Sequence, residues 1–137
     1  MRQRLPIGLA ALWWGSLTTL GFMVVPLLFM VLPTPALAGS TAAKLFTAQT
    51  WLSMACTLLL LLISRSKQAL AQVKHAPAAT IFIAFGLFAA VLVEFAVSPH
   101  IVARENLKLW HGLGTGLYLL QWLAAGATLW KVSAPRR

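Results

Sequence analysis

Four long apolar runs alternate with short polar segments along the chain. The runs cover residues 5–32, 45–64, 78–97 and 107–130. A helix needs about 20 mostly apolar residues to cross a bilayer core of about 30 Å, and every run reaches that length. Because membrane-spanning strands are shorter and alternate between apolar and polar residues, the pattern predicts helices. We therefore predict an all-α fold with one domain over residues 1–137: an integral membrane four-helix bundle, antiparallel, with short connections.

The composition supports a membrane protein over a water-soluble one. Of the 137 residues, 60% are hydrophobic and only 9% are charged. Soluble domains are about half apolar and about one quarter charged. The net charge of +9 comes from basic residues in the gaps between apolar runs. These short gaps offer no folded basic surface, so we expect the lipid bilayer as the main partner and no nucleic acid.

The distribution of the basic residues predicts the orientation in the membrane. One side would hold Arg2, Arg4, Arg65, Lys67, Lys74, Lys131, Arg136 and Arg137, and the other only Lys44, Arg104 and Lys108. Basic loops stay in the cytoplasm. This asymmetry predicts that both termini are cytoplasmic.

The start of the chain has an alternative interpretation. Arg2 and Arg4 precede an apolar run, and the small residues 36–39 resemble a signal-peptide cleavage site. A signal peptide has an apolar region of about 7–15 residues, and this run is much longer. We therefore expect a retained first helix, which is long enough to tilt or to kink near Pro26.

One acidic residue, Glu94, lies inside a predicted membrane span. Such residues are costly in lipid and mark a function or a specific pairing. Glu94 lies three residues from the end of its run, and His111 lies four residues into the next run. Both are about 5–6 Å below the same end. We expect them to meet as a hydrogen-bonded or ionic couple, with either a structural role or a role toward a proton, metal or substrate.

Other polar residues form stripes at helical spacing. The last run carries His111, Thr115, Tyr118, Gln121 and Thr128 on one face. In the second run, Gln49 lies at about the depth of Glu94. The candidate intramembrane polar site therefore comprises Glu94, His111, Gln49, Tyr118 and Gln121. The stripes also fit simple helix packing, for which the candidate positions are Gly15, Gly86, Ala90, Gly112, Gly116 and Pro26.

No pattern for catalysis or for a cofactor is present in the sequence. The glycines at 112, 114 and 116 lie in an apolar run without the Lys-Ser/Thr of a phosphate loop. Zinc needs three or four protein ligands, and His111 stands alone in its run. No nucleophile, base and orienting residue stand at a triad spacing. We therefore predict no catalytic residues, no metal site and no cofactor.

The order of short motifs resembles a known family. Gly21-Phe22 precedes Pro26 in the first run, and an acid near the end of the third run precedes Ser98-Pro99-His100. The fourth run opens with Leu109-Trp110-His111-Gly112-Leu113. This order is similar to the transmembrane protein 205-like family, whose bacterial form is filed as domain of unknown function 4149.

The resemblance implies a four-helix multipass protein, in the inner membrane for the bacterial form, and no established reaction. Pro26, Glu94 and His111 match its pattern. Gly114-Thr115-Gly116 departs from the Ser-rich step followed by Asn that we would expect after His-Gly.

Three functional hypotheses remain open at this point. The first is a membrane protein of unassigned role that acts through helix packing or through partners, either a second copy of the chain or another membrane protein. The second is a small transporter or channel component that uses the polar cluster on the outer side. The third is a membrane-embedded metal or haem binder.

Overall fold

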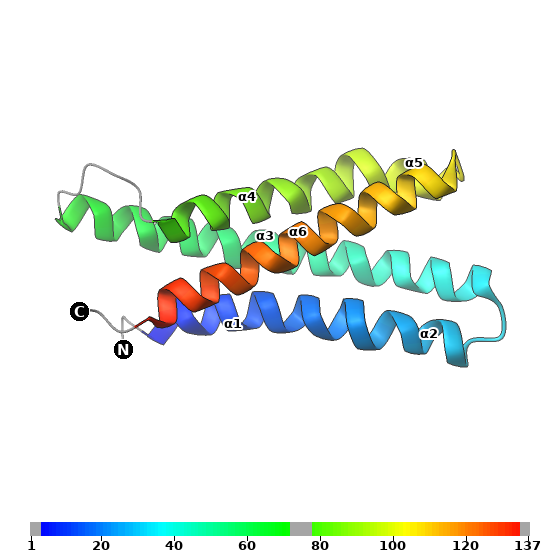
Figure 1. Ribbon diagram of the computed structural model, residues 1–137, viewed down its shortest axis with the longest axis horizontal. Coiled ribbons are helices and arrows are strands. Elements are labelled where there is room, and N and C mark those ends of the chain that lie inside the picture. Colours follow the sequence, from blue (N-terminus) through cyan, green and yellow to red (C-terminus); the bar gives the residue numbers. More distant parts are fainter. Residues whose placement is uncertain (1–3, 72–77, 135–137) are drawn as a thin grey trace.

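The computed structural model describes residues 4–71 and 78–134, which form four continuous helical segments (Figure 1). The first segment combines α1 (Arg4–Thr19), the π-helical turn η1 (Leu20–Val24) and α2 (Val25–Val31), and α3 (Pro35–Ala71) is the second. The third combines α4 (Ala78–Leu92), the π-helical turn η2 (Val93–Val97) and α5 (Ser98–Val102), and α6 (Leu107–Ser133) is the fourth. The predicted all-helical class is confirmed.

Three of these segments are long and apolar enough to cross a membrane. Within the described residues they are Arg4–Val31, Pro35–Ser66 and Ala78–Val102. The fourth segment, α6, has 27 residues but does not reach the hydropathy of a candidate span. Three of the four predicted spans are therefore supported by length and composition, and the fourth crossing stays a prediction.

The second helix begins ten residues earlier than the predicted range of 45–64. Thr34 caps it, because the Thr34 hydroxyl accepts a hydrogen bond of 3.2 Å from the backbone N–H of Leu37. Pro35 occupies the first helical position, where its fixed φ and missing N–H suit a helix start. The small residues that follow continue the helix, and Ala38 and Ala42 are buried. The segment that resembles a signal-peptide cleavage site thus lies within α3.

The third helical segment continues through Pro99 instead of ending at residue 97 as predicted. The N–H of Ser98 bonds to the carbonyl of Val93, five residues back. This wider π turn brings Pro99 to the start of α5, where its missing N–H and its ring are tolerated. The same device precedes Pro26, because the N–H of Val25 bonds to the carbonyl of Leu20. The irregularity expected near Pro26 therefore takes the form of a π turn.

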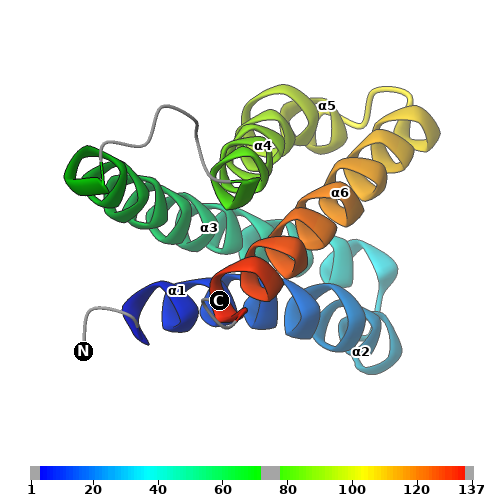
Figure 2. The ribbon, with the colours of Figure 1, turned by 60° about the vertical axis from the view of Figure 1, so that its left-hand side comes forward.

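α6 crosses the other segments and packs against both α1 and α4, and α3 packs against the same two helices (Figure 2). The buried apolar core comprises Ala10, Trp13, Leu17, Cys56, Leu60, Ile83 and Ala125. This core occupies the half of the molecule where α1 begins and α6 ends, which we call the core end (Figure 1). The opposite half, where α2 ends and α6 begins, we call the cavity end.

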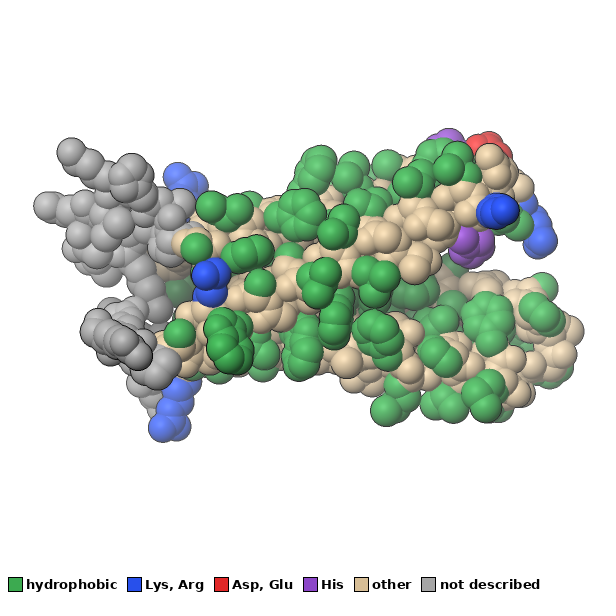
Figure 3. Space-filling view, in the orientation of Figure 1, with side chains coloured by type: hydrophobic (Ala, Val, Ile, Leu, Met, Phe, Trp, Pro, Cys, Tyr) green, Lys and Arg blue, Asp and Glu red, His purple; other side chains and the backbone are tan. Residues whose placement is uncertain are grey.

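The outer surface of the helices is largely apolar. Figure 3 shows hydrophobic side chains over the whole length of the visible face, with basic residues near its two ends. Large exposed side chains include Met30 at 79% and Trp130 at 79% exposure. A soluble monomer rarely presents so extended an apolar surface, whereas a lipid-facing surface requires one.

Candidate functional site

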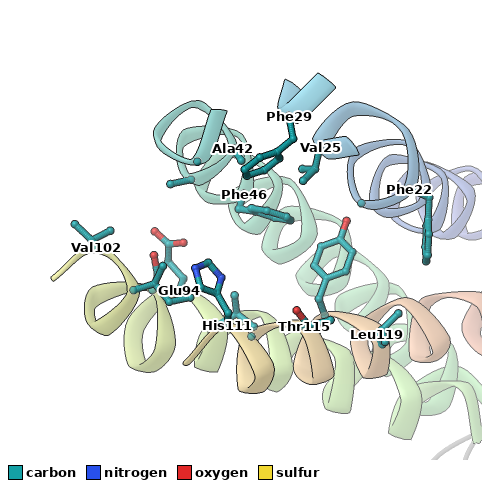
Figure 4. A pocket seen from close by; sticks show the side chains of 18 residues that line it. Phe22, Val25, Phe29, Ala42, Phe46, Glu94, Val102, His111, Thr115 and Leu119 are labelled. Atoms are coloured by element: carbon teal, nitrogen blue, oxygen red, sulfur yellow. The ribbon is translucent and has the colours of Figure 1, made fainter. Parts of the chain in front are cut away.

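A cavity of about 380 Å³ lies at the cavity end, between η1, α2, the start of α3, η2, α5 and the start of α6 (Figure 4). Most of its wall is apolar and includes Phe22, Val25, Phe29, Phe46 and Leu119. The side chains with polar groups are Glu94, Ser98, His111, Thr115 and Tyr118. A mostly apolar pocket with a few convergent polar groups is the usual form of a small-molecule site.

Glu94 enters this cavity from the π turn η2. The hydroxyl of Thr47 on α3 donates to its carboxylate, at 3.0 Å from Oε1 and 3.3 Å from Oε2. Among the described residues, Glu94 has no cationic partner. The ion pair found there lies in the turn between α5 and α6, where His100 pairs with Glu105. A half-buried carboxylate in a membrane segment thus keeps most of its acceptor capacity open toward the cavity.

His111 lies on the second turn of α6 and lines the same cavity (Figure 4). Within residues 4–71 and 78–134, no hydrogen bond or ion pair joins it to Glu94, whose hydrogen bond goes to Thr47 instead. The expected couple is therefore not formed in the chain alone. Matching depth fixes only the position along each helix, whereas the rotation of both helices decides whether two side chains touch.

Tyr118 forms part of the cavity wall, and both its hydroxyl and its ring contact neighbouring helices. Its hydroxyl donates to the carbonyl of Leu17 at 2.6 Å, and its ring meets Phe46 edge-on with centroids 5.4 Å apart. The ring also lies against Gly21, where an added Cβ would come within 2.6 Å of Cε1 of Tyr118. Gly21 is required here because only a residue without a side chain permits this close approach.

Gln49 and Gln121 do not belong to the cavity lining. Gln49 is 8% exposed, and its amide donates to Ser16 at 2.9 Å and to Ser53 at 3.3 Å. Gln121 is 3% exposed, and its Nε2 has no partner in the described part of the chain. The structure thus brings Glu94, His111 and Tyr118 together and places both glutamines between the helices.

The positions predicted for helix packing fall into two groups. Gly86 and Ala90 are buried, and a Cβ added to Gly86 would overlap the Trp13 ring. A Cβ added to any of Gly15, Gly112 and Gly116 would meet nothing within 4 Å. These three glycines therefore make no close helix contact within one chain, and their role in packing stays a prediction.

Sequence reasoning missed Thr47, the hydrogen-bond donor to Glu94. The predicted second helix started at residue 45, so Thr47 stood at its end without a fixed facing direction. The available signal was weak: Thr47 lies two residues before Gln49 in the same predicted helix and carries a hydroxyl at a similar depth. The aromatic wall was missed because phenylalanines in a membrane span are ordinary.

The turn between α5 and α6 has its own polar arrangement outside the cavity. His100 stacks on Trp110 with centroids 4.0 Å apart and an interplanar angle of 5°, and its Nδ1 pairs with Glu105. Arg104 and Asn106 have positive φ angles of 57° and 30°, which allow the tight reversal. Across the described ranges, no three His, Cys, Asp or Glu side chains gather as a metal site would require.

A family model described as a domain of unknown function (DUF4149) matches residues 8–108, from α1 to the first residues of α6. No curated protein and no solved structure matches the chain. The matched region contains Glu94, Thr47 and the walls of the cavity that come from the first three helical segments. Because it covers well over half of the sequence, the chain belongs to the DUF4149 family.

Proposed function

We propose that the protein is a multipass protein of the cytoplasmic membrane that binds a small ligand in the cavity near its extracytoplasmic end. The main supporting observation is that Glu94 lies in the wall of a cavity of about 380 Å³. Glu94 is an intramembrane carboxylate without a cationic partner in the described chain. Small-molecule sites have volumes of about 300–1,000 Å³. Isolated ionisable groups in membrane segments mark such sites.

The proposed topology has four crossings with both termini in the cytoplasm, in the inner membrane of a bacterium. Eight basic residues on the side of the termini against three on the other support it. As the fourth crossing, α6 is long enough, since its 27 residues extend about 40 Å. Its motif around His111 also supports kinship with the transmembrane protein 205-like family.

Reporter fusions test this topology. Fusions after Lys44 and after Arg104 are expected to report an extracytoplasmic position, and fusions at Lys67 and at the C-terminus a cytoplasmic one. An extracytoplasmic C-terminus would overturn the four-crossing arrangement and with it the assignment of the cavity to the outer side.

Cysteine labelling tests whether the cavity is open to water from outside. In a Cys56→Ala background, a cysteine at Thr115 is expected to react in whole cells with a charged, membrane-impermeant maleimide. Thr115 lines the cavity on α6. The matched control is Leu123→Cys on the same helix, since Leu123 is 58% exposed but does not line the cavity, and this cysteine should stay unlabelled in lipid. Equal protection of both cysteines in a folded protein would contradict a ligand cavity.

Binding is better supported than translocation. Below the cavity, the core end is closed by side chains with almost no exposure, among them Trp13, Leu17 and Ile83. A transport path would have to open this core, so the transporter alternative requires a larger assembly of several copies. The metal or haem alternative lacks a supporting ligand set among residues 4–71 and 78–134.

A further inference from the structure

We propose that the cavity selects a small amphipathic amine, with its protonated nitrogen on the carboxylate of Glu94 and its apolar body among the phenylalanines of the wall. This inference rests on the proposed function, because it names the chemical class of the ligand that the cavity holds.

The carboxylate determines the charge of the ligand's polar group. Thr47 supplies one hydroxyl donor shared between the two carboxylate oxygens, while an ionised carboxylate can accept about four hydrogen bonds. A charged group that is removed from water is stabilised only when it is paired and hydrogen-bonded. An ammonium group supplies both the opposite charge and up to three donors. An anionic ligand would instead stand beside an unpaired negative charge.

The remaining wall determines the rest of the ligand. Phe22, Phe29 and Phe46 line the cavity together with aliphatic side chains and provide apolar area. Aromatic faces also attract cations, which adds to the preference for an amine over a neutral compound. The hydroxyl of Tyr118 is already bonded to the carbonyl of Leu17, so this residue offers the ligand a ring and not a donor.

His111 and Thr115 flank the position proposed for the nitrogen on the α6 side (Figure 4). Both are exposed toward the cavity. They can contact a second polar group of the ligand but do not neutralise Glu94 through any hydrogen bond or ion pair found in the described chain. The charge preference therefore comes from Glu94.

Three probes of the same shape and different charge test the proposal: 4-phenylbutylamine, 4-phenylbutanol and 4-phenylbutyrate. Their binding to the full-length protein in phosphatidylcholine nanodiscs is measured by calorimetry, with empty nanodiscs subtracted. The amine is expected to bind about tenfold more tightly than the alcohol, which corresponds to about 1.4 kcal/mol, and the carboxylate more weakly than both. Equal or tighter binding of the carboxylate overturns the proposal, and this comparison needs no variant.

Two matched variants locate the preference. Glu94→Gln keeps the shape of the side chain and an acceptor for Thr47 but removes the charge, so the advantage of the amine over the alcohol should disappear. Glu105→Gln removes the other acid of the chain, at a side chain that is 60% exposed and outside the cavity, and should leave the advantage unchanged. Retention of the full advantage in Glu94→Gln overturns the proposal.

A cavity-filling variant separates this inference from the proposed function. Thr115→Trp should abolish binding of all three probes. If the alcohol or the carboxylate binds best and Thr115→Trp abolishes that binding, the ligand cavity stands and the amine preference fails. If no probe binds, or if Thr115→Trp changes nothing, the proposed function fails as well.

The amine could come from water or from the headgroup of a lipid such as phosphatidylethanolamine. The source is distinguished by repeating the titration in nanodiscs that contain this lipid. Weaker apparent binding of 4-phenylbutylamine indicates that the headgroup competes for Glu94. Unchanged binding indicates a free amine.

Discussion

The core end and the cavity end use the same four helical segments but fill the space between them differently. At the core end, Trp13 is completely buried and its ring lies where Gly86 has no side chain. At the cavity end, Gly39 and Gly112 have no neighbour near the position of a Cβ, and about 380 Å³ remains open. The Tyr118 ring lies against Gly21 at the cavity end much as the Trp13 ring lies against Gly86 at the core end, but no side chain fills the space beside Gly39 and Gly112.

The two π turns belong to the cavity end. η1 contributes Gly21 and Phe22 to the cavity wall, and η2 contributes Val93 and Glu94. A π turn costs regular helical hydrogen bonding and occurs often at functional sites. Because lipid is as apolar as the side chains, helices in a membrane associate through complementary shape and not through exclusion of water. Close packing is therefore concentrated at one end of this protein, while the other end keeps an open cavity.

Removal of a large ring should give the largest difference in stability between the two ends. Trp13→Ala leaves a void in the core and is expected to lower the free energy of unfolding by about 3–5 kcal/mol. Phe29→Ala is the control at the cavity end, where the side chain is 53% exposed and the loss should be small. The measurement is unfolding by sodium dodecyl sulfate, followed by circular dichroism. Equal losses would show that the cavity end is packed as tightly as the core.

Addition of one methyl group gives a smaller effect with opposite signs at the two ends. Gly86→Ala forces the Trp13 ring to move and should cost about 1–3 kcal/mol. Gly112→Ala meets nothing within 4 Å in the chain. It should stabilise its helix by up to about 1 kcal/mol, because alanine loses less conformational entropy than glycine. The same unfolding titration compares them, and destabilisation by Gly112→Ala would reveal a packing partner from outside the chain.

The smallest expected effect distinguishes the partners of Glu94. A double-mutant cycle of Glu94→Ala with Thr47→Val should give a coupling of about 0.6–1.7 kcal/mol, from the average to the largest value for hydrogen bonds between membrane helices. The cycle of Glu94→Ala with His111→Ala should give less, since no hydrogen bond joins these residues in the described structure. Both cycles are measured from the free energy of unfolding in detergent. A larger coupling to His111 would restore the direct couple expected from the sequence.

Much of the fold follows from local patterns in the sequence. Hydropathy alone placed the first helix within one residue of Arg4–Val31, because an apolar run of this length has few alternatives to a membrane helix. Glu94 was also singled out from local information, since an acid in such a run is unusual wherever its helix lies. The predicted range failed at Pro99, because the helix was expected to end at residue 97 and instead continues through this proline after a π turn.

Only the tertiary structure decided which side chains share the site. Gln49 and Glu94 were placed at the same depth from the sequence, yet Gln49 turns toward Ser16 and Ser53 while Thr47, two residues earlier, bonds to Glu94. Two residues along a helix correspond to a rotation of about 200° at 3.6 residues per turn. The sequence determines depth through the rise per residue, but the facing direction depends on how whole helices rotate against one another and on the phase that each π turn adds.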